Sequence, residues 1–248
     1  MIATAVDAAG KDGSITIQEA RSLDTTLDVV EGFRFDSGYI SGQFVTDERR
    51  ATVKYDDPLI VITDEKIEIV DEMLPMLEIA ARESRPFIII AENIEGQALA
   101  ALIMNAVRGT MKVAAIKAPR YGEERRSILK DLAISTGATF ISRESGKSLR
   151  NVNISDFGSA KSIEIAKNFT TIIDASGDDE EVEKRIESLK AELEQTEDIY
   201  ECERIQERIT RLASGVAIIN VGAATEIEMI EKKHRVEDSL EAVKSARD

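Results

Sequence analysis

Residues 92–119 read ENIEGQALAALIMNAVRGTMKVAAIKAP, and the expected fold of the chain is built around this stretch. It follows one apolar run, FIII at 87–90, and contains a second, VAAI at 113–116. Between them, residues 98–107 are mostly apolar and numerous enough for a helix. The stretch therefore predicts a strand, a helix and a second strand in succession.

The helix predicted for 98–107 has more apolar surface than one packing contact requires. With 100° between successive residues, its apolar arc covers roughly 200°, about twice the stripe with which a surface helix covers a core. The arc contains Leu99, Leu102, Ile103, Met104, Ala106 and Val107. Either the helix is buried on nearly all sides, or one half packs on the sheet and the other is exposed for a partner. Periodicity leaves both interpretations open.

Composition and charge limit the classes of protein to which the chain can belong. Its 248 residues suffice for one or two domains, and 43% of them are hydrophobic, enough for a substantial core. The formal net charge of −15 opposes binding to nucleic acid or to an anionic membrane, so we expect neither partner. Cys202 is the only cysteine, which fits a reducing compartment, and no apolar run is long enough to span a membrane. We therefore expect a cytoplasmic protein.

The rest of the chain predicts a mixed sheet interleaved with helices, an α/β fold with flanking helices. Strands are expected at 14–17, 27–30, 58–63, 139–141, 160–165, 170–174 and 216–221. Helices are expected at 2–9, from near Leu74 after a short helix or turn that starts at about 64, at 127–136, and at 225–246. The apolar repeat of 178–212 changes phase near 195–198, which favours an antiparallel helical hairpin.

Enzymatic motifs are scarce in this sequence. Gly10 and Lys11 lack the glycine spacing and the following Ser or Thr of a phosphate-binding loop. The only histidine, His234, lies between Lys233 and Arg235, a position typical of a solvated surface residue. Asp238 is one candidate functional carboxylate, although spacing alone gives it little weight in an acidic chain.

Five separated segments resemble, in the same order, the group I chaperonin family, the GroEL or chaperonin 60 proteins. The segments are VEGFRFDSGYIS (30–41), EMLPMLE (72–78), AENIEGQALAALIMNAVRGTMKVAAIKAP (91–119), GVAIINVGAATEIEM (215–229) and EKKHRVEDSLEA (231–242). The resemblance implies a GroEL-like apical domain of β/β/α fold at 31–215, which includes the hairpin. It also implies partial intermediate-domain segments at 1–30 and 216–248, in a fragment that lacks the ATP-binding equatorial domain.

The resemblance implies a molecular chaperone that binds non-native polypeptides and the mobile loop of a GroES-type co-chaperonin. In the family, the contact is made by an apolar groove between two helices and an underlying extended segment. The matching positions here are Tyr39, Phe44, Leu74, Leu77, Leu99, Ile103 and Met104, with Asn105 at the edge. The resemblance therefore favours the exposed interpretation for one face of each helix.

Other matched positions imply mechanical and ATP-linked functions in a full-length parent. Gly32 and Gly215 match the apical hinge, where the backbone must rotate. Asp238 matches an aspartate of the intermediate domain that supports ATP hydrolysis. The resemblance implies ATP and Mg as cofactors of the parent, which would form a ring homo-oligomer. For the fragment itself we expect no enzymatic activity and no cofactor.

Two positions depart from the family pattern. Gln43 stands where a tyrosine of the binding surface is usual, and Ser37 replaces an arginine that pairs between subunits with the glutamate matching Glu226. Two other classes of function stay open. The chain could be a small α/β enzyme with a site that the sequence does not reveal, or a structural oligomerisation module that uses the same two helices.

Overall fold

The computed structural model describes residues 4–5, 14–20, 23–213 and 215–247. The chain divides into two compact units: unit 1 is Met1–Gly32 with Ala213–Asp248, and unit 2 is Phe33–Leu212. The chain thus passes between the units after Gly32 and after Leu212, close in sequence to the predicted hinge glycines Gly32 and Gly215. A hinge function for these glycines stays a prediction.

Unit 1 contains a small sheet and one long helix. Its elements are β1 (Ser14–Glu19), β2 (Thr26–Phe35), which extends three residues into unit 2, β12 (Gly215–Val221) and α7 (Glu226–Arg247). Strand β12 pairs in parallel with β1 and antiparallel with β2. The core of the unit includes Ile17, Ile219 and Leu240. Of the helix expected at 2–9, only Thr4 and Ala5 are described, and both are helical; the remainder lies outside the described residues.

Unit 2 is built on a mixed sheet with the strand order β11-β10-β4-β6-β8, in which β3 also pairs with β10 and β9 with β4. The strands are β3 (Val53–Asp56), β4 (Leu59–Thr63), β6 (Phe87–Ala91), β8 (Val113–Lys117), β9 (Phe140–Ile141), β10 (Gly158–Ile165) and β11 (Thr170–Ala175). Strands β9, β4, β6 and β8 are parallel, whereas β10 runs antiparallel to β3, β4 and β11.

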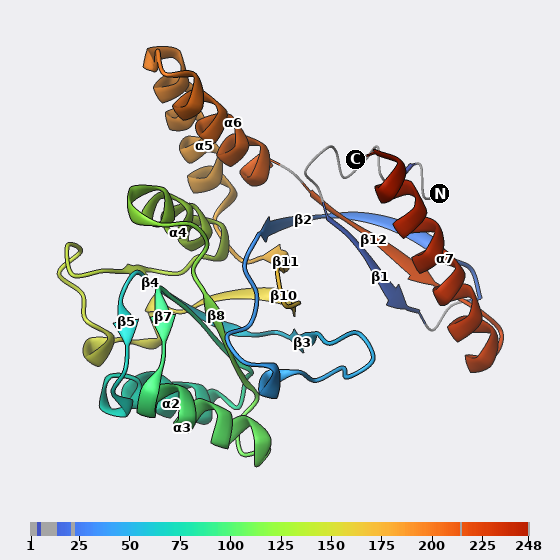
Figure 1. The fold of residues 1–248 in the computed structure, drawn as a ribbon, viewed down its shortest axis with the longest axis horizontal. Coiled ribbons are helices and arrows are strands. Elements are labelled where there is room, and N and C mark those ends of the chain that lie inside the picture. The colour runs from blue at the N-terminus through green and yellow to red at the C-terminus, as the bar shows by residue number, and fades with distance from the viewer. Residues whose placement is uncertain (1–3, 6–13, 21–22, 214, 248) are drawn as a thin grey trace. The chain divides into compact units, whose positions relative to one another are not determined.

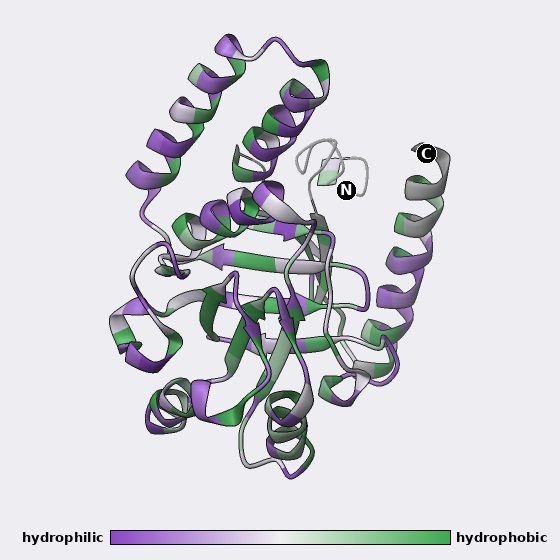
Figure 2. Cartoon of the chain, turned by 60° about the vertical axis from the view of Figure 1, so that its left-hand side comes forward, coloured by the Kyte–Doolittle hydropathy of each residue, from purple (hydrophilic) through white to green (hydrophobic). Residues whose placement is uncertain are grey.

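Helices cover both faces of the parallel strands. Helices α2 (Leu74–Glu83) and α3 (Gly96–Val107) lie side by side on one face, and α4 (Gly122–Thr136) lies on the other (Figure 1). Every residue of β4 and β6 is consequently buried, which explains why these strands read as uninterrupted apolar runs. Figure 2 shows the hydrophobic residues concentrated along the central strands.

The predicted helical hairpin is present in unit 2. Helix α5 (Asp179–Gln195) and helix α6 (Ile199–Ala213) are separated by a short turn. Leu189, Ile205 and Ile209 form a small buried cluster between them. Polar and apolar residues alternate along both helices (Figure 2) because only one stripe of each faces its partner.

The predicted fold class, α/β with a mixed sheet and flanking helices, is confirmed. The finer GroEL-like β/β/α assignment stays a prediction. Several short elements were not predicted: β5 (Lys66–Ile67) and β7 (Asn93–Ile94), which pair with each other, and the 3₁₀ turns η1 (Gly42–Phe44), η3 (Leu149–Asn151) and η4 (Ile154–Asp156). The 3₁₀ turn η2 (Val70–Glu72) lies where the sequence predicts a short helix or turn before α2. None of the helices in the described part of the chain is both long and apolar enough to cross a membrane.

Candidate functional site

Helix α2 presents one large apolar side chain to solvent. The helix begins at Leu74 with Pro75 in its first turn, where the missing N–H costs no hydrogen bond. Met76, Leu77 and Ala80 face inward and are buried. Leu74, by contrast, is 42% exposed. The start of α2 therefore places an apolar side chain at the surface.

The segment around β5 and η2 fixes the first turn of α3. Gly96 has a φ of +62°, a left-handed conformation that glycine adopts without strain. The N–H of Glu95 donates to the carbonyl of Ile67 at 3.0 Å, and the N–H of Ala98 donates to the carbonyl of Glu68 at 3.1 Å. These bonds satisfy amide groups that a helix start leaves without intrahelical partners. The beginning of α3 therefore lies beside the segment that leads into α2.

Helix α3 combines the two interpretations of its wide apolar arc. Ala98 and Leu102 are fully buried. Leu99 and Ile103 are half-buried and pack against the core of unit 2. Met104 is 49% exposed. The helix is therefore neither buried on all sides nor free along a complete half.

The chain just before η1 lies along the edge of β8. The N–H of Ile40 donates to the carbonyl of Ala115 at 2.9 Å, and the N–H of Lys117 donates to the carbonyl of Gly38 at 3.4 Å. Tyr39, between these contacts, is half-buried and packs against the core of unit 2. That Tyr39 belongs to an extended segment that contacts a bound polypeptide stays a prediction.

The expectation that Phe44 and Leu77 lie at the exposed surface is wrong. Phe44 is 1% exposed and Leu77 is 9% exposed, and both belong to the core of unit 2. The reason is packing: η1 lies against α3, and Leu77 is on the inner face of α2. These two side chains support the surface from beneath.

Two exposed apolar residues next to the expected site were not among the predicted site residues. Ile69, directly before η2, is 51% exposed, and Val107, the last residue of α3, is 67% exposed. Val107 belongs to the apolar arc of 98–107, so the sequence could have identified it as a site residue. Ile69 lies outside any periodic element and gave no such signal. We refer to Ile69, Leu74, Met104 and Val107 together as the α2–α3 surface.

Asn105 uses its side chain to close the end of α3. Its amide Nδ2 donates to the carbonyl of Ala101 at 2.9 Å, and its Oδ1 accepts from the Thr110 hydroxyl at 3.0 Å. An asparagine amide has two N–H groups and an oxygen with two lone pairs, so each group retains capacity for one more partner. Contact between Asn105 and a bound peptide backbone stays a prediction.

The remaining candidates are not among the residues of the α2–α3 surface. Asp238 and His234 are exposed on α7 of unit 1. Gln43 is exposed in η1, and the hydroxyl of Ser37 donates to the carbonyl of Lys117. Across residues 4–5, 14–20, 23–213 and 215–247, no group of three or more His, Cys, Asp and Glu side chains is arranged to hold a metal ion.

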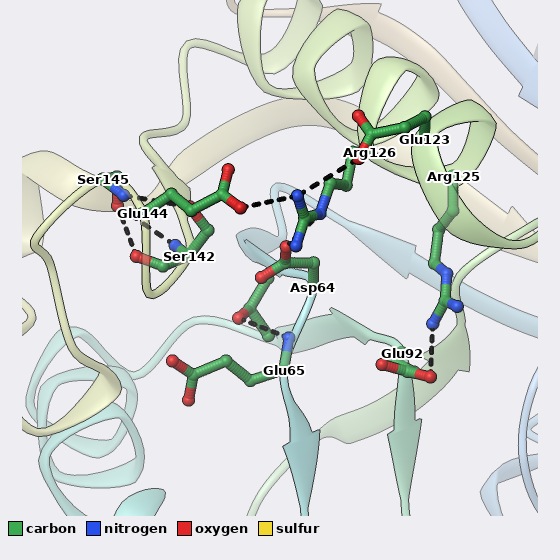
Figure 3. Close-up of polar contacts among 10 residues, drawn as sticks. Asp64, Glu65, Glu92, Glu123, Arg125, Arg126, Ser142, Glu144 and Ser145 are labelled. Carbon is green, nitrogen blue, oxygen red and sulfur yellow. Dashed lines mark hydrogen bonds and ion pairs between the residues drawn. The ribbon is translucent and has the colours of Figure 1, made fainter.

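A separate polar cluster lies where β4, β6 and β9 end (Figure 3). Arg126 of α4 pairs with Asp64 at 3.1 Å and with Glu144 at 2.7 Å, and Arg125 pairs with Glu92 at 2.7 Å. Ligands of open α/β sheets bind at this edge. Here, however, the arginines are paired with carboxylates of the chain itself. The cluster therefore ties the start of α4 to the ends of the strands.

Glu65 lies beside this cluster with a perturbed carboxyl group. Burial raises its pKa above the ordinary value, and the neighbouring carboxylates of Asp64 and Glu72 add to the rise, whereas Arg143 opposes it. A raised pKa alone does not define an enzyme site, because structural ion networks perturb pKa values as well.

The α2–α3 surface is therefore the clearest candidate site in the part of the chain that the structure describes. A search of protein-family models finds no match to the chain.

Proposed function

We propose that this chain contains the polypeptide-binding domain of a group I chaperonin and that the α2–α3 surface holds non-native polypeptides. The observation that carries the proposal is the exposure of Leu74 and Met104, at 42% and 49%, on two neighbouring helices. Exposed apolar surface of this kind favours a partner, since its burial releases free energy. The five segments that resemble the family support the same function.

The chemistry of the surface suits partners of varied sequence. Leu and Met side chains attract other apolar groups without fixed direction, and the flexible thioether of Met104 adapts to different shapes. Complete burial of such a side chain contributes about 1.5–3 kcal/mol. Because the side chains of Leu74 and Met104 are already about half-covered in the free protein, we expect each to contribute roughly 1 kcal/mol to the free energy of binding. A single copy should bind weakly, and a ring of copies would bind more tightly through avidity.

The resemblance alone supports the other parts of the proposal. They are a GroES-type co-chaperonin as second partner, a cytoplasmic location and a ring homo-oligomer as the full-length form. In that form, ATP and Mg would be the cofactors, Asp238 would support ATP hydrolysis, and Gly32 and Gly215 would act as hinge residues.

The proposal can be tested with charged substitutions at the exposed positions. We expect Leu74→Glu and Met104→Glu each to weaken binding of a fluorescently labelled, denatured protein by about tenfold, with the melting temperature changed by roughly 2 °C or less. Ile199→Glu is the matched control, because Ile199 is 74% exposed on the hairpin and should bind as the unaltered chain does. Leu99 and Ile103 are poorer probes, since a charge at these half-buried positions would disturb the core.

Two results would contradict the proposal. If Leu74→Glu and Met104→Glu bind denatured protein as well as the Ile199→Glu control, the α2–α3 surface is not the binding site. If the unaltered chain instead forms a stable oligomer that both substitutions dissociate, the surface serves as an oligomerisation interface. Sedimentation at several protein concentrations separates the second result from client binding.

A further inference from the structure

Charged residues around the α2–α3 surface are distributed unevenly along its length. Glu65, Glu68, Asp71 and Glu72 accompany a single lysine, Lys66, in the segment that leads into α2. The ammonium group of Lys66 is engaged by Glu68 at 2.8 Å and by Glu95. The end of the surface that contains Ile69 and Leu74 is therefore acidic.

The opposite end of the surface has more basic than acidic groups, with Glu83 as the acidic residue in the last turn of α2. Arg82 lies in the last turn of α2 and is exposed, and Arg108 directly follows α3 and is exposed, with Lys112 a few residues beyond. Helices α2 and α3 each connect neighbouring parallel strands, from β4 to β6 and from β6 to β8, so their C-termini point the same way. The basic groups of both helices consequently gather at one end, near Val107.

Helix stability explains part of this distribution, because acidic groups near helix N-termini and basic groups near C-termini interact favourably with the helix dipole.

Asp71 is the acidic residue that the helix dipole does not fully account for. It is exposed, it stands in η2 between the exposed residues Ile69 and Leu74 in the sequence, and it forms no ion pair among the described residues. A carboxylate in this position is available to a cation of any molecule that covers the two apolar side chains.

Building on the proposed function, we propose that the α2–α3 surface selects polypeptide segments in which apolar residues adjoin a group of lysines or arginines. The apolar side chains would cover Ile69, Leu74 and Met104, and the basic group would lie against Asp71 and its neighbouring carboxylates. Apolar contacts alone would not fix the orientation of the bound segment. Attraction between its basic group and the acidic end of the surface would favour one orientation.

The test uses two peptides with the same apolar core, one flanked at one end by lysines and the other by glutamates. At low ionic strength we expect the lysine peptide to bind about three- to tenfold more tightly, and the difference to shrink in high salt. Asp71→Lys should remove most of the preference. Glu187→Lys is the control, because Glu187 is exposed on the hairpin and the substitution changes the net charge equally without altering the surface.

The outcomes separate this inference from the function on which it rests. Equal affinity for the two peptides, with both lost in Leu74→Glu, would overturn the charge preference and leave the chaperone proposal intact. A preference that Glu187→Lys reduces as much as Asp71→Lys does would overturn the local role of Asp71, because overall charge would then suffice. Failure of both peptides to bind would overturn the preference and the proposed function together.

Discussion

Asp156 illustrates how the surroundings of one residue fix its charge. The side chain is 2% exposed, and burial by itself would raise the pKa of its carboxyl group. Hydrogen bonds from Lys147, from the N–H of Asn153 at 3.0 Å and from the Thr139 hydroxyl at 2.9 Å outweigh burial, so the pKa lies below its ordinary value. The ionised carboxylate therefore holds η4 and the loop around Lys147 against the start of β9.

A lowered pKa makes this contribution dependent on pH. The ionised form stabilises the fold above the pKa of the unfolded state, which is about 4, and the effect is lost as the pH falls through the lower folded-state value. We expect Asp156→Asn to lower the free energy of unfolding at pH 7, with the gap to the unaltered chain shrinking as the pH falls below about 4. Urea unfolding at a series of pH values measures this gap, and a gap that stays constant over the range would contradict the prediction.

The individual residues of the candidate site differ in exposure in a way that the sequence could not reveal. Phe44, Leu74 and Leu77 are all apolar, and all match the binding positions of the family, yet only Leu74 is exposed. Exposure depends on which neighbouring element covers a side chain, and no local pattern contains that information. The arc of 98–107 left open whether one half of α3 is exposed, and it did not show that Leu99 and Ile103 would be half-covered.

Among the elements, α4 and the hairpin are joined by one buried carboxylate. Asp131 of α4 is 1% exposed and accepts a hydrogen bond from Arg185 Nε at 2.8 Å. It accepts two more from Arg208, from Nε at 2.7 Å and Nη2 at 3.0 Å. Arg185 belongs to α5 and Arg208 to α6, so a single side chain of α4 contacts both arms of the hairpin. Such charge-assisted bonds are among the stronger polar contacts in proteins.

Removing the carboxylate should loosen the hairpin. We expect Asp131→Ala to lower the free energy of unfolding by about 3 kcal/mol, because two partly buried arginines lose their counter-charge. For a chain of this size, that loss corresponds to roughly 6–12 °C in melting temperature. Glu187→Ala, at an exposed position of α5, is the control and should change stability by about 0.5 kcal/mol or less. Equal thermal unfolding of the two variants would show that the contact contributes little.

Long, periodic elements were the predictable part of the fold. The buried strands β4 and β6 are uninterrupted apolar runs, and the change of phase near 195–198 marked the turn of the hairpin. Helix α4 begins at Gly122, earlier than predicted, because its first residues, GEERR, have no apolar repeat. Glu123 and Glu124 stabilise this start through the helix dipole instead. Two-residue strands such as β5 are too short to produce a periodic signal.

At the scale of the whole molecule, only two chain crossings connect the compact units, one after Gly32 and one after Leu212. Unit 2 contains its own extensive core and the complete α2–α3 surface. We therefore expect a polypeptide of residues 33–212 to fold alone, since a domain of this size can bury a sufficient core. Circular dichroism should show one cooperative thermal transition, and peptide affinity should match that of the full chain. A broad transition without cooperativity would show that unit 2 depends on unit 1.

The hydrogen bonds between β8 and the chain around Tyr39 have a consequence for how a client could be held. They occupy the carbonyl of Ala115 and the N–H of Lys117, groups that an unfolded chain would need in order to extend the sheet as an added strand. Under the proposed function, this protection would keep the edge of β8 from becoming a template on which extended client chains aggregate. Its clients would be retained by side-chain contacts alone, which can be released one at a time, and would leave without having been drawn into β-structure.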